Sequence, residues 1–239
     1  MGKTVGILGG LGPMATVYFY EMIVRMTDAT KDQEHLDMVI MNKATTPDRT
    51  AYINGESDEN PAIDLINSAK KLQACGCSVI TMPCNTAHYF YDEIQSSIDI
   101  QMLNMPKETV KYIKNKNYKK VGILATKGTI KANIYQNICK EYNLEYETLD
   151  ETNQELIMNI IYNQIKAGQK PNMDDFYKAV EYLKTHNCDC IILGCTELSI
   201  LKEDNNLNKE FYIDSMEKLA EKLIEYSGKG IKGRNWKWD

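Results

Sequence analysis

Two cysteines stand where predicted β-strands end. Cys84 follows a short apolar segment, 78–82, that lies between a glycine and a proline, and Cys195 follows a second apolar segment, 190–194. Short apolar runs of this kind are typical of strands that are buried on both faces of a sheet. A thiol at the carboxyl edge of such a sheet lies among backbone N–H groups, which lower its pKa and attract anions.

The two cysteines belong to an internal repeat. Cys84 and Cys195 are 111 residues apart (195 − 84), and the sequence Val-Gly-Ile-Leu occurs at 5–8 and again at 121–124, an offset of 116 residues (121 − 5). Two matched signatures at nearly one offset indicate a duplication. We therefore expect two half-chains that each present one thiol to a shared cleft.

Composition narrows the class of protein. The chain has 239 residues, which suits two units of about 110 to 120 residues, near the usual size of a domain. The net charge is −5 and the Lys and Arg residues are scattered, so we expect no nucleic-acid partner. No apolar run approaches the ~20 residues of a membrane span, and the N-terminus has no signal-peptide layout. Seven cysteines without an export signal favour reduced thiols in the cytoplasm.

Strand and helix patterns alternate along the chain, which predicts an α/β fold. The first domain is expected to comprise 1–104 plus about 214–228, the second 105–213, and the basic tail 229–239, with Trp236 and Trp238, is treated as an appendage. The predicted strands are 3–8, 37–42, 78–82, 100–103, 121–125, 144–148 and 211–214, and the main helices 13–27, 61–74, 107–114, 153–167, 173–185 and 215–226.

The loop after the first strand offers two interpretations. Gly10, Gly12 and Ala15 fit the dinucleotide fingerprint G-x-G-x-x-A, which would make the chain a nucleotide-dependent oxidoreductase. The second strand lacks the acidic residue that would hold a ribose, and the helix begins at once with Pro13. These two departures favour a tight turn whose backbone amides face a small anion.

Several polar side chains are expected near the thiols. Arg49 is predicted to lie in a loop at the carboxyl edge, free to clamp a carboxylate with its two-pronged guanidinium. Polar residues that follow each cysteine suit helix starts, where they cap free amides. In the second half, the segment 126–129 takes the place of the glycine loop. The residues expected to bind the substrate here are Asn85, Thr86 and Thr196 after the cysteines, and Thr126 and Thr129 in the loop.

Two Cys-x-Cys pairs raise the possibility of a zinc site. They are Cys75 with Cys77 and Cys188 with Cys190. No His or further Cys stands at ligand spacing beside either pair, so strand alternation and burial explain them better and no metal is expected.

Four motifs closely resemble the aspartate/glutamate racemase family. They are Gly-Gly-Leu-Gly-Pro-Met-Ala-Thr at 9–16, Pro-Asp-Arg-Thr at 47–50, Met-Pro-Cys-Asn-Thr-Ala-His at 82–88 and Gly-Cys-Thr-Glu-Leu at 194–198. The resemblance spans the chain from the first strand to the last helix. It implies two pseudo-twofold-related α/β domains with parallel sheets, a cleft between them, no cofactor, a small acidic amino acid as substrate and a homodimer.

The resemblance also assigns residues. It implies that Cys84 and Cys195 are the catalytic pair and that Arg49 and Lys166 clamp the substrate. Lys166 stands two residues before Gly168, where a cation also suits the end of a helix. His88 and Glu197 are candidates for residues that support the catalytic groups, and the sequence leaves their roles open. His88 orients groups near the thiol or is a structural hydrogen-bonder, and Glu197 meets the substrate ammonium or holds a partner in place.

Sequence differences within the family indicate the branch. Glutamate racemases of the family carry Asp-Ser-Gly after the first strand and Gly-Cys-Thr-His at the second cysteine, whereas this chain has Gly9, Gly10 and Glu197 at these places. The chain therefore resembles the aspartate branch, with glutamate as a further possible substrate. Relatives with one or both cysteines decarboxylate or isomerise small dicarboxylates such as maleate, which is one alternative. A non-catalytic amino-acid-binding protein is another, although binding alone would not need two thiols.

Racemisation explains why two thiols are needed. A proton must leave Cα from one face and another must arrive on the opposite face, and two fixed groups achieve this without crossing the carbon. A thiolate on one side and a thiol on the other meet this need, and their protonation states are exchanged after turnover. Backbone amides after each cysteine and in the loops are expected to stabilise the negative charge on the substrate carboxylate.

Overall fold

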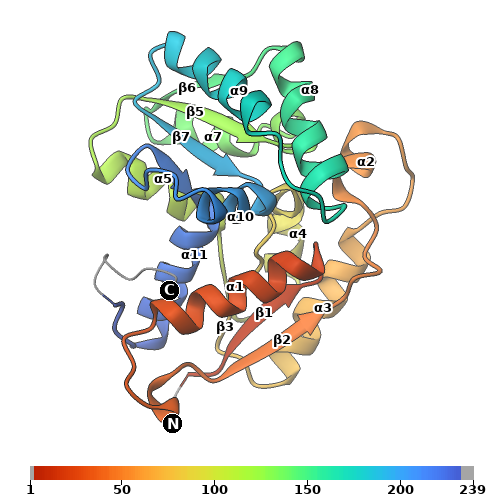
Figure 1. Ribbon diagram of the computed structural model, residues 1–239. Helices are drawn as coiled ribbons and strands as arrows, with labels where there is room; N and C mark the ends of the chain where they lie inside the picture. Colours follow the sequence, from red (N-terminus) through yellow and green to blue (C-terminus); the bar gives the residue numbers. More distant parts are fainter. Residues whose placement is uncertain (1–2, 233–239) are drawn as a thin grey trace.

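The computed structural model describes residues 3–232 and contains two parallel four-stranded sheets with the same strand order. The order is β2-β1-β3-β4 in the first sheet and β6-β5-β7-β8 in the second. Figure 1 shows one sheet in each half of the molecule, with helix α11 between the halves. The repeat predicted from the sequence is therefore a repeat of topology, and the predicted α/β fold class is confirmed.

The first half follows the predicted alternation of strands and helices. Its elements are β1 (Val5–Gly9), α1 (Pro13–Met26), η1 (Asp32–Glu34), β2 (Met38–Asn42), α2 (Arg49–Asn54), α3 (Ala62–Ala74), β3 (Val79–Thr81), η2 (Thr86–Phe90), α4 (Tyr91–Ser96) and β4 (Gln101–Leu103).

The second half repeats the plan and ends with a helix that leaves it. Its elements are α5 (Met105–Asn115), β5 (Lys120–Ala125), α6 (Lys127–Lys131), α7 (Ile134–Glu141), β6 (Glu145–Thr148), α8 (Glu151–Asn159), the π-helix η3 (Ile160–Ile165), α9 (Met173–Thr185), β7 (Cys190–Gly194), α10 (Thr196–Asp204), β8 (Tyr212–Asp214) and α11 (Ser215–Ser227).

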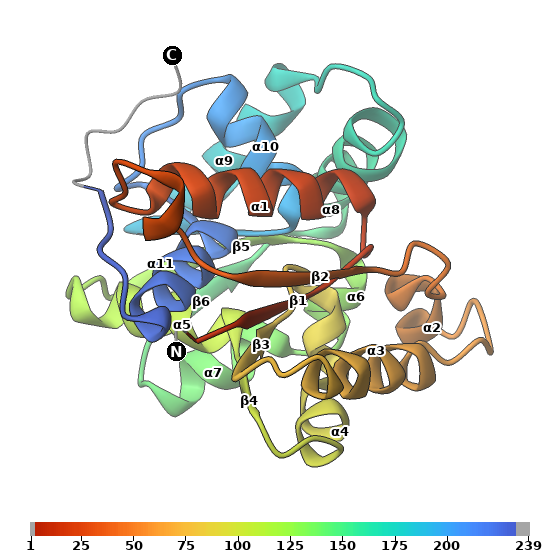
Figure 2. The ribbon, with the colours of Figure 1, turned by 90° about the horizontal axis from the view of Figure 1, so that it is seen from below.

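The central strands are apolar throughout because helices cover both of their faces. Figure 2 shows α1 on one side of the first sheet and α3 on the other. Val5 and Ile7 of β1 pack in the core with α1 and α11, whereas Leu8 of β1 and Ile80 of β3 pack with α3. Burial of both faces is what keeps a parallel strand free of polar residues.

Helix α11 packs on the first half. Its buried residues Leu219 and Leu223 join the core cluster that contains β1 and α1. At its start, buried Lys202 of α10 donates to Glu217 Oε2 at 2.6 Å, which links α11 to the second half by a charged pair. This packing supports our proposal that 214–228 belong with 1–104 and that 105–213 form the second domain.

Three local predictions are wrong in detail. Arg49 opens helix α2 and does not lie in a loop, because Asp48 caps that helix by accepting from the backbone N–H of Ala51. The segment after Cys84 begins as the 3₁₀-helix η2 before α4 continues it. The predicted helix 153–167 is α8 followed by the π-helix η3, in which the N–H of Lys166 donates to Ile161 five residues back.

The tail is only partly an appendage. The N–H of Asp28 donates to the carbonyl of Gly230, and the N–H of Lys232 donates to the carbonyl of Met26. Residues 229–232 are thereby fastened to the end of α1. Trp236 and Trp238 lie outside the described residues.

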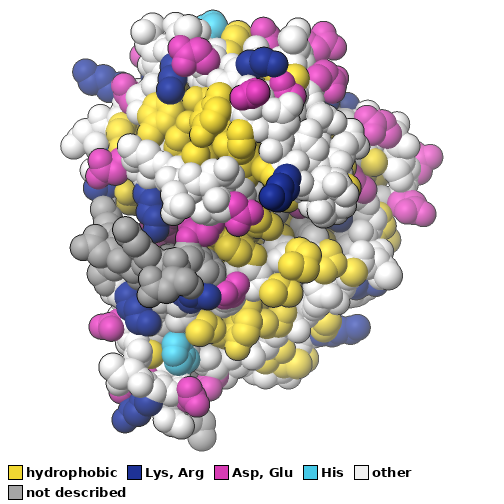
Figure 3. All heavy atoms as spheres, in the orientation of Figure 1, with side chains coloured by type: hydrophobic (Ala, Val, Ile, Leu, Met, Phe, Trp, Pro, Cys, Tyr) yellow, Lys and Arg dark blue, Asp and Glu magenta, His cyan; other side chains and the backbone are white. Residues whose placement is uncertain are grey.

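Helix α1 leaves one apolar face uncovered. Met14, Val17 and Tyr20 are 70%, 56% and 43% exposed, respectively. Figure 3 shows hydrophobic side chains gathered on the face of the molecule where α1 lies. No helix within residues 3–232 is long and apolar enough to cross a membrane.

Candidate active site

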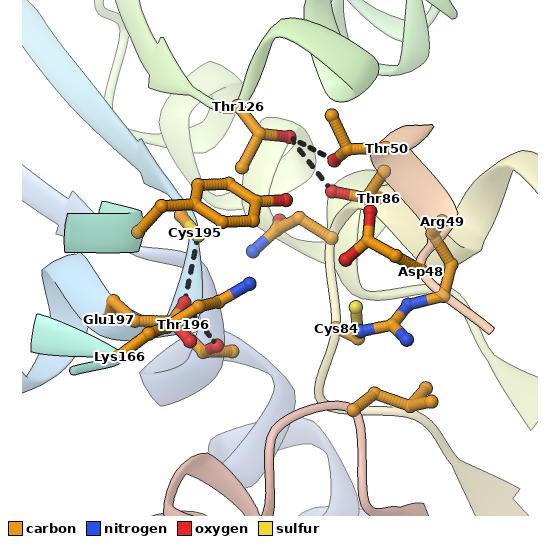
Figure 4. Close-up of a pocket in the computed structure, with 13 residues that line it drawn as sticks. Asp48, Arg49, Thr50, Cys84, Thr86, Thr126, Lys166, Cys195, Thr196 and Glu197 are labelled. Carbon is orange, nitrogen blue, oxygen red and sulfur yellow. Dashed lines mark hydrogen bonds between the residues drawn. The ribbon is translucent and has the colours of Figure 1, made fainter. Parts of the chain in front are cut away.

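The two cysteines of the repeated motifs line one cleft between the halves of the molecule. Cys84 follows β3 and Cys195 follows β7, so each stands at the carboxyl end of a parallel strand, where ligands of α/β proteins bind. The cleft contains about 300 Å³ of empty space, which includes space open to solvent. Its lining residues are Leu11, Asp48, Arg49, Thr50, Cys84, Asn85, Thr86, Thr126, Tyr162, Lys166, Cys195, Thr196 and Glu197. Figure 4 shows Cys84 and Cys195 on opposite sides of this space.

The Cys195 turn holds its thiol against a carboxylate. Cys195 is the N-cap of α10, and its Sγ donates to Glu197 Oε2 at 2.9 Å. Thr196 Oγ1 donates to the same oxygen at 3.1 Å. Thr196 was predicted to cap the helix, but its side chain supports Glu197 instead. Burial raises the pKa of Cys195 well above its ordinary value, and the negative charge of Glu197 raises it further. Cys195 therefore keeps its proton at neutral pH in this arrangement.

The Cys84 turn is held through its backbone by His88. The imidazole Nδ1 donates to the carbonyl of Cys84 at 2.8 Å, and its Nε2 accepts from the N–H of Met105 at 3.1 Å. These two bonds define the tautomer, with the proton on Nδ1. Burial lowers the pKa of His88 to about 4, so the ring is neutral at pH 7. His88 thus positions the backbone of Cys84 and adds no positive charge beside the thiol.

Arg49 places a buried cation on the Cys84 side of the cleft. Its side chain is 9% exposed, and Nη1 donates to the carbonyls of Pro47 at 3.0 Å and Thr46 at 3.3 Å. Its Nε is buried and has no hydrogen-bond partner among the residues that the structure describes. A buried donor without a partner is costly, so this guanidinium is suited to receive an anionic ligand.

Lys166 places a second cation on the Cys195 side. The π-helix directly before it changes the helical register, as π-turns often do at functional sites. Its Nζ lies 4.0 Å from the centre of the Tyr162 ring and, in Figure 4, points into the space between the cysteines. Burial tends to lower the pKa of Lys166, but the nearby Glu197 and Cys195 raise it above its ordinary value. Lys166 is therefore charged.

Four threonines join the halves at one wall of the cleft. Thr86 Oγ1 lies 3.0 Å from Thr126 Oγ1 and 2.9 Å from Thr129 Oγ1, and Thr50 Oγ1 donates to Thr126 at 3.5 Å. Gly128 permits the contact, because a Cβ there would lie 2.9 Å from the Thr50 backbone. Thr126 also caps α6 by accepting from the backbone N–H of Thr129, and this cap was not predicted. Binding of substrate by Thr86, Thr126 and Thr129 stays a prediction, and their hydroxyls are engaged with one another.

Two other predicted contacts are occupied by internal partners. The amide of Asn85 bonds to Tyr135 and Ser215 and does not cap the following helix. In the glycine loop, the N–H of Gly10 donates to Thr16 Oγ1 at 2.9 Å and is therefore not free for an anion. Leu11 of that loop lines the cleft instead.

Sequence reasoning missed Tyr162, Asp48, Thr50 and Leu11 as lining residues. The signal for Tyr162 is its spacing: it stands four residues before Lys166, and such pairs share one face of a helix. Asp48 precedes Arg49 in a motif already singled out, and its role here is to cap α2. Nothing in the local pattern distinguishes Leu11.

A wider groove adjoins the cleft. It contains about 1060 Å³ of empty space and shares Asp48, Arg49, Lys166 and Glu197 with the cleft. The residues of its outer wall are largely apolar, and several of them are small: Gly10, Gly12, Pro13, Met14, Ala15, Ala44, Ile165 and Ile200. The groove provides a path from solvent to the thiols.

The sequence model of one protein family matches most of the chain. The Asp/Glu/hydantoin racemase family matches residues 8–223, a range that contains both cysteine turns and both cations.

Known proteins similar to the chain include racemases. The broad specificity amino-acid racemase RacX of Bacillus subtilis (strain 168) is 31% identical over 230 residues, covering 92% of this chain and 96% of the relative. The structure of Picrophilus torridus aspartate racemase has a TM-score of 0.81 at 33% identity, covering 97% of this chain and 96% of the other. An aspartate racemase homologue from Pyrococcus horikoshii OT3 has a TM-score of 0.76 at 26% identity, covering 95% and 100%.

Proposed function

The chain belongs to the Asp/Glu/hydantoin racemase family, and from this premise we propose that it interconverts L- and D-aspartate without a cofactor. The observation that carries the proposal is the pair of thiols on opposite sides of one cleft, flanked by two cations, the buried Arg49 and the more exposed Lys166. Two equivalent positions of a duplicated topology each supply a sulfur, which is what a reaction at two faces of one carbon requires.

The proposed reaction moves one proton on and one proton off Cα. The thiolate takes the Cα proton and becomes a thiol, and the C–H electron pair passes into the substrate carboxylate as an enolate. The opposite thiol then gives its proton to the other face of Cα and becomes a thiolate. Atoms balance, the substrate is inverted, and the two sulfurs have exchanged protonation states.

We propose that Cys195 carries a proton before the reaction begins. Because its Sγ–H donates to Glu197 and its pKa is raised, Cys195 enters the reaction as the acid. In the proposed reaction Cys84 is then the base that takes the Cα proton from one enantiomer. After turnover the thiolate is at Cys195, beside the carboxylate of Glu197, and this repulsion favours return to the resting state.

We propose that Arg49 and Lys166 hold the negatively charged groups of the substrate. Arg49 has an unpartnered Nε and a planar fork that matches a carboxylate, and Lys166 offers a single charged ammonium. Both cations are proposed to hold the substrate so that Cα faces the two sulfurs, and backbone N–H groups at the cysteine turns are proposed to stabilise the charge that develops on the enolate.

A racemase of broader range is the second candidate. The observation that favours it is the groove of about 1060 Å³ next to the thiols, whose outer wall carries Met14, Ile165 and Ile200. Such a wall accepts apolar side chains longer than that of aspartate. The substrate test must therefore include an apolar amino acid.

Assembly and location are proposed on the same family basis. We propose a homodimer in the cytoplasm, and the exposed apolar residues of α1 offer a surface for self-association. Sedimentation equilibrium of the wild-type chain and of Val17→Glu measures the state directly.

The test of the proposed function is proton NMR in deuterated water. The wild-type protein is incubated with L-aspartate, L-glutamate or L-methionine, and chiral chromatography measures the enantiomers. We expect the α-proton signal of aspartate to disappear as D-aspartate forms. Loss of the signal with methionine at a similar rate supports the broader racemase, and an unchanged signal with all three contradicts both candidates.

A further inference from the structure

Tyr135 contacts both thiol-bearing turns from behind the cleft. Its hydroxyl donates to Asn85 Oδ1, and Asn85 directly follows Cys84. The edge of its ring, Cε2, lies 3.1 Å from the position that a Cβ on Gly194 would take, and Gly194 directly precedes Cys195. Tyr135 is fully buried. One aromatic side chain of α7 therefore spans the distance between the two turns.

A second link runs from the same asparagine to the Cys195 strand. Asn85 Nδ2 donates to Ser215 Oγ at 3.1 Å, and Ser215 Oγ donates to the carbonyl of Leu193 at 2.9 Å. Leu193 stands two residues before Cys195 in β7. Donation therefore runs in one direction from the Tyr135 hydroxyl to β7, with a donor matched to an acceptor at each step.

The burial of this series of hydrogen bonds makes the series rigid. Asn85 is 2% exposed, and Tyr135, Ser215 and Leu193 are fully buried, so a broken bond cannot readily be replaced by one to water. Burial also raises the pKa of Tyr135 above its ordinary value, which keeps the hydroxyl protonated as a donor. Neither Tyr135 nor Ser215 is among the described residues that line the cleft. Their place is behind the reacting groups.

We propose that Tyr135 is a positioning residue that sets the spacing between Cys84 and Cys195, with Asn85 and Ser215 as the connecting groups. The inference rests on the proposed function, because the spacing matters only when both thiols act on one Cα. In that reaction the carbanion is either captured by the opposite thiol, which gives inversion, or reprotonated on the face it left. A misplacement of about 1 Å costs on the order of 100-fold in rate. Looser spacing slows capture more than abstraction.

Tyr135→Phe is the test, because it removes the hydroxyl and keeps the ring against Gly194. Wild type and variant react with each enantiomer of aspartate in deuterated water. Chiral chromatography gives the rate of inversion, and mass spectrometry gives deuterium in the recovered substrate, which is incorporated when a carbanion returns to its original face after the thiol has exchanged with solvent. We expect inversion to fall roughly 10-fold to 100-fold with KM nearly unchanged, and the ratio of exchange to inversion to rise at least about 5-fold.

Two further variants separate positioning from general stability. Ser215→Ala breaks the second link while Tyr135 remains, and it should also raise the ratio of exchange to inversion. This variant tests the proposal even if Tyr135→Phe does not fold. Tyr226→Phe is the matched control, because its hydroxyl donates to the carbonyl of Ser78 at 3.1 Å, away from both turns. That variant should keep the wild-type ratio.

The outcomes distinguish the two proposals. A structural role alone would lower the number of active molecules, so exchange and inversion would fall together; an unchanged ratio in Tyr135→Phe and Ser215→Ala, with an active wild type, overturns the positioning inference and leaves the racemase intact. A wild type that neither exchanges nor inverts any amino acid overturns the proposed function and, with it, this role.

Discussion

The turns that carry Cys84 and Cys195 both leave the third strand in the order of a four-stranded parallel sheet, yet their surroundings differ. The Cys195 sulfur donates to a carboxylate, that of Glu197, two residues away. The Cys84 turn is tied through its carbonyl to the neutral ring of His88. One cation stands on each side, a forked guanidinium near Cys84 and an ammonium near Cys195.

The difference between the two turns shows that the repeated topology and the local neighbours of each cysteine have separate roles. The repeated topology delivers two sulfurs to opposite walls, and the different neighbours assign their protons. A racemase has an equilibrium constant of one between enantiomers in water, so kcat/KM must be equal in the two directions. Asymmetry between the turns must therefore appear in kcat and KM separately, and in reactions that use only one thiol.

The largest effect is expected from removing either sulfur. Cys84→Ser and Cys195→Ser should each abolish inversion in both directions, because a serine hydroxyl has a far higher pKa than a thiol and each direction needs one donor and one acceptor. Each variant should still exchange the Cα proton with solvent deuterium, and the two should act on opposite enantiomers.

Mass spectrometry of each enantiomer after incubation in deuterated water measures this. The comparison of two opposed bases breaks down when both variants exchange the same enantiomer, or when either one racemises at a rate near that of wild type.

The two cations should differ next. Arg49→Ala should lower kcat/KM for aspartate on the order of 100-fold to 1000-fold, because it removes a forked, charge-assisted contact, and Lys166→Met should lower it less. Arg49→Lys keeps the charge but loses the fork, and should recover only part of the loss.

Steady-state kinetics on aspartate and on an uncharged amino acid provide the control. Activity on the uncharged amino acid should fall less than activity on aspartate. Equal loss on both would mean that Arg49 supports the fold of α2 and does not bind a carboxylate.

Glu197→Gln sharpens the comparison through pH. The carboxylate raises the pKa of Cys195, so its neutral replacement should lower that pKa. In the Cys84→Ser background, where Cys195 is the remaining base, exchange increases as the thiol deprotonates with rising pH. We expect Glu197→Gln to move the midpoint of this increase to lower pH.

The same substitution in the Cys195→Ser background is the matched control, because exchange there depends on Cys84. Its midpoint should move less. Equal shifts in both backgrounds would show that Glu197 acts on the whole cleft and that the two turns do not differ in the proposed way.

The smallest effect is expected from His88, and it concerns stability. Burial lowers the pKa of His88 from 6.5 to about 4, so between these values the unfolded chain binds a proton that the folded chain does not. The free energy of unfolding should therefore decrease as pH falls from 6.5 to 4, by up to about 3 kcal/mol from this residue.

Urea denaturation of wild type and His88→Asn over this pH range tests the effect. Asparagine keeps a donor near the Cys84 carbonyl but does not titrate, so its curve should be flatter than that of wild type. Since the other ionisable groups are common to both, parallel curves would contradict the role of His88 in the acid sensitivity of the Cys84 turn.

Much of the fold followed from local patterns. Short apolar runs located β1, β3, β5 and β7, and the helix 173–185 was predicted with the bounds of α9. These predictions succeed because a strand buried on both faces must be apolar along its length, and because Asn172 caps α9 through a short-range bond. The spacing of the cysteines predicted that the two thiols would stand at equivalent strand ends.

What the sequence determined by itself is thus the repeated α/β plan, with one sulfur at the carboxyl edge of each sheet. Tertiary structure alone decided that Arg49 would be buried at the start of a helix, that Tyr162 would lie beneath Lys166, and that the amide of Asn85 would be held by Tyr135 and Ser215. The bonds of Asn85 join residues 50 and 130 positions apart. Periodicity reports which face of an element is buried, but the partner that a buried polar group finds depends on which distant elements the packing brings beside it.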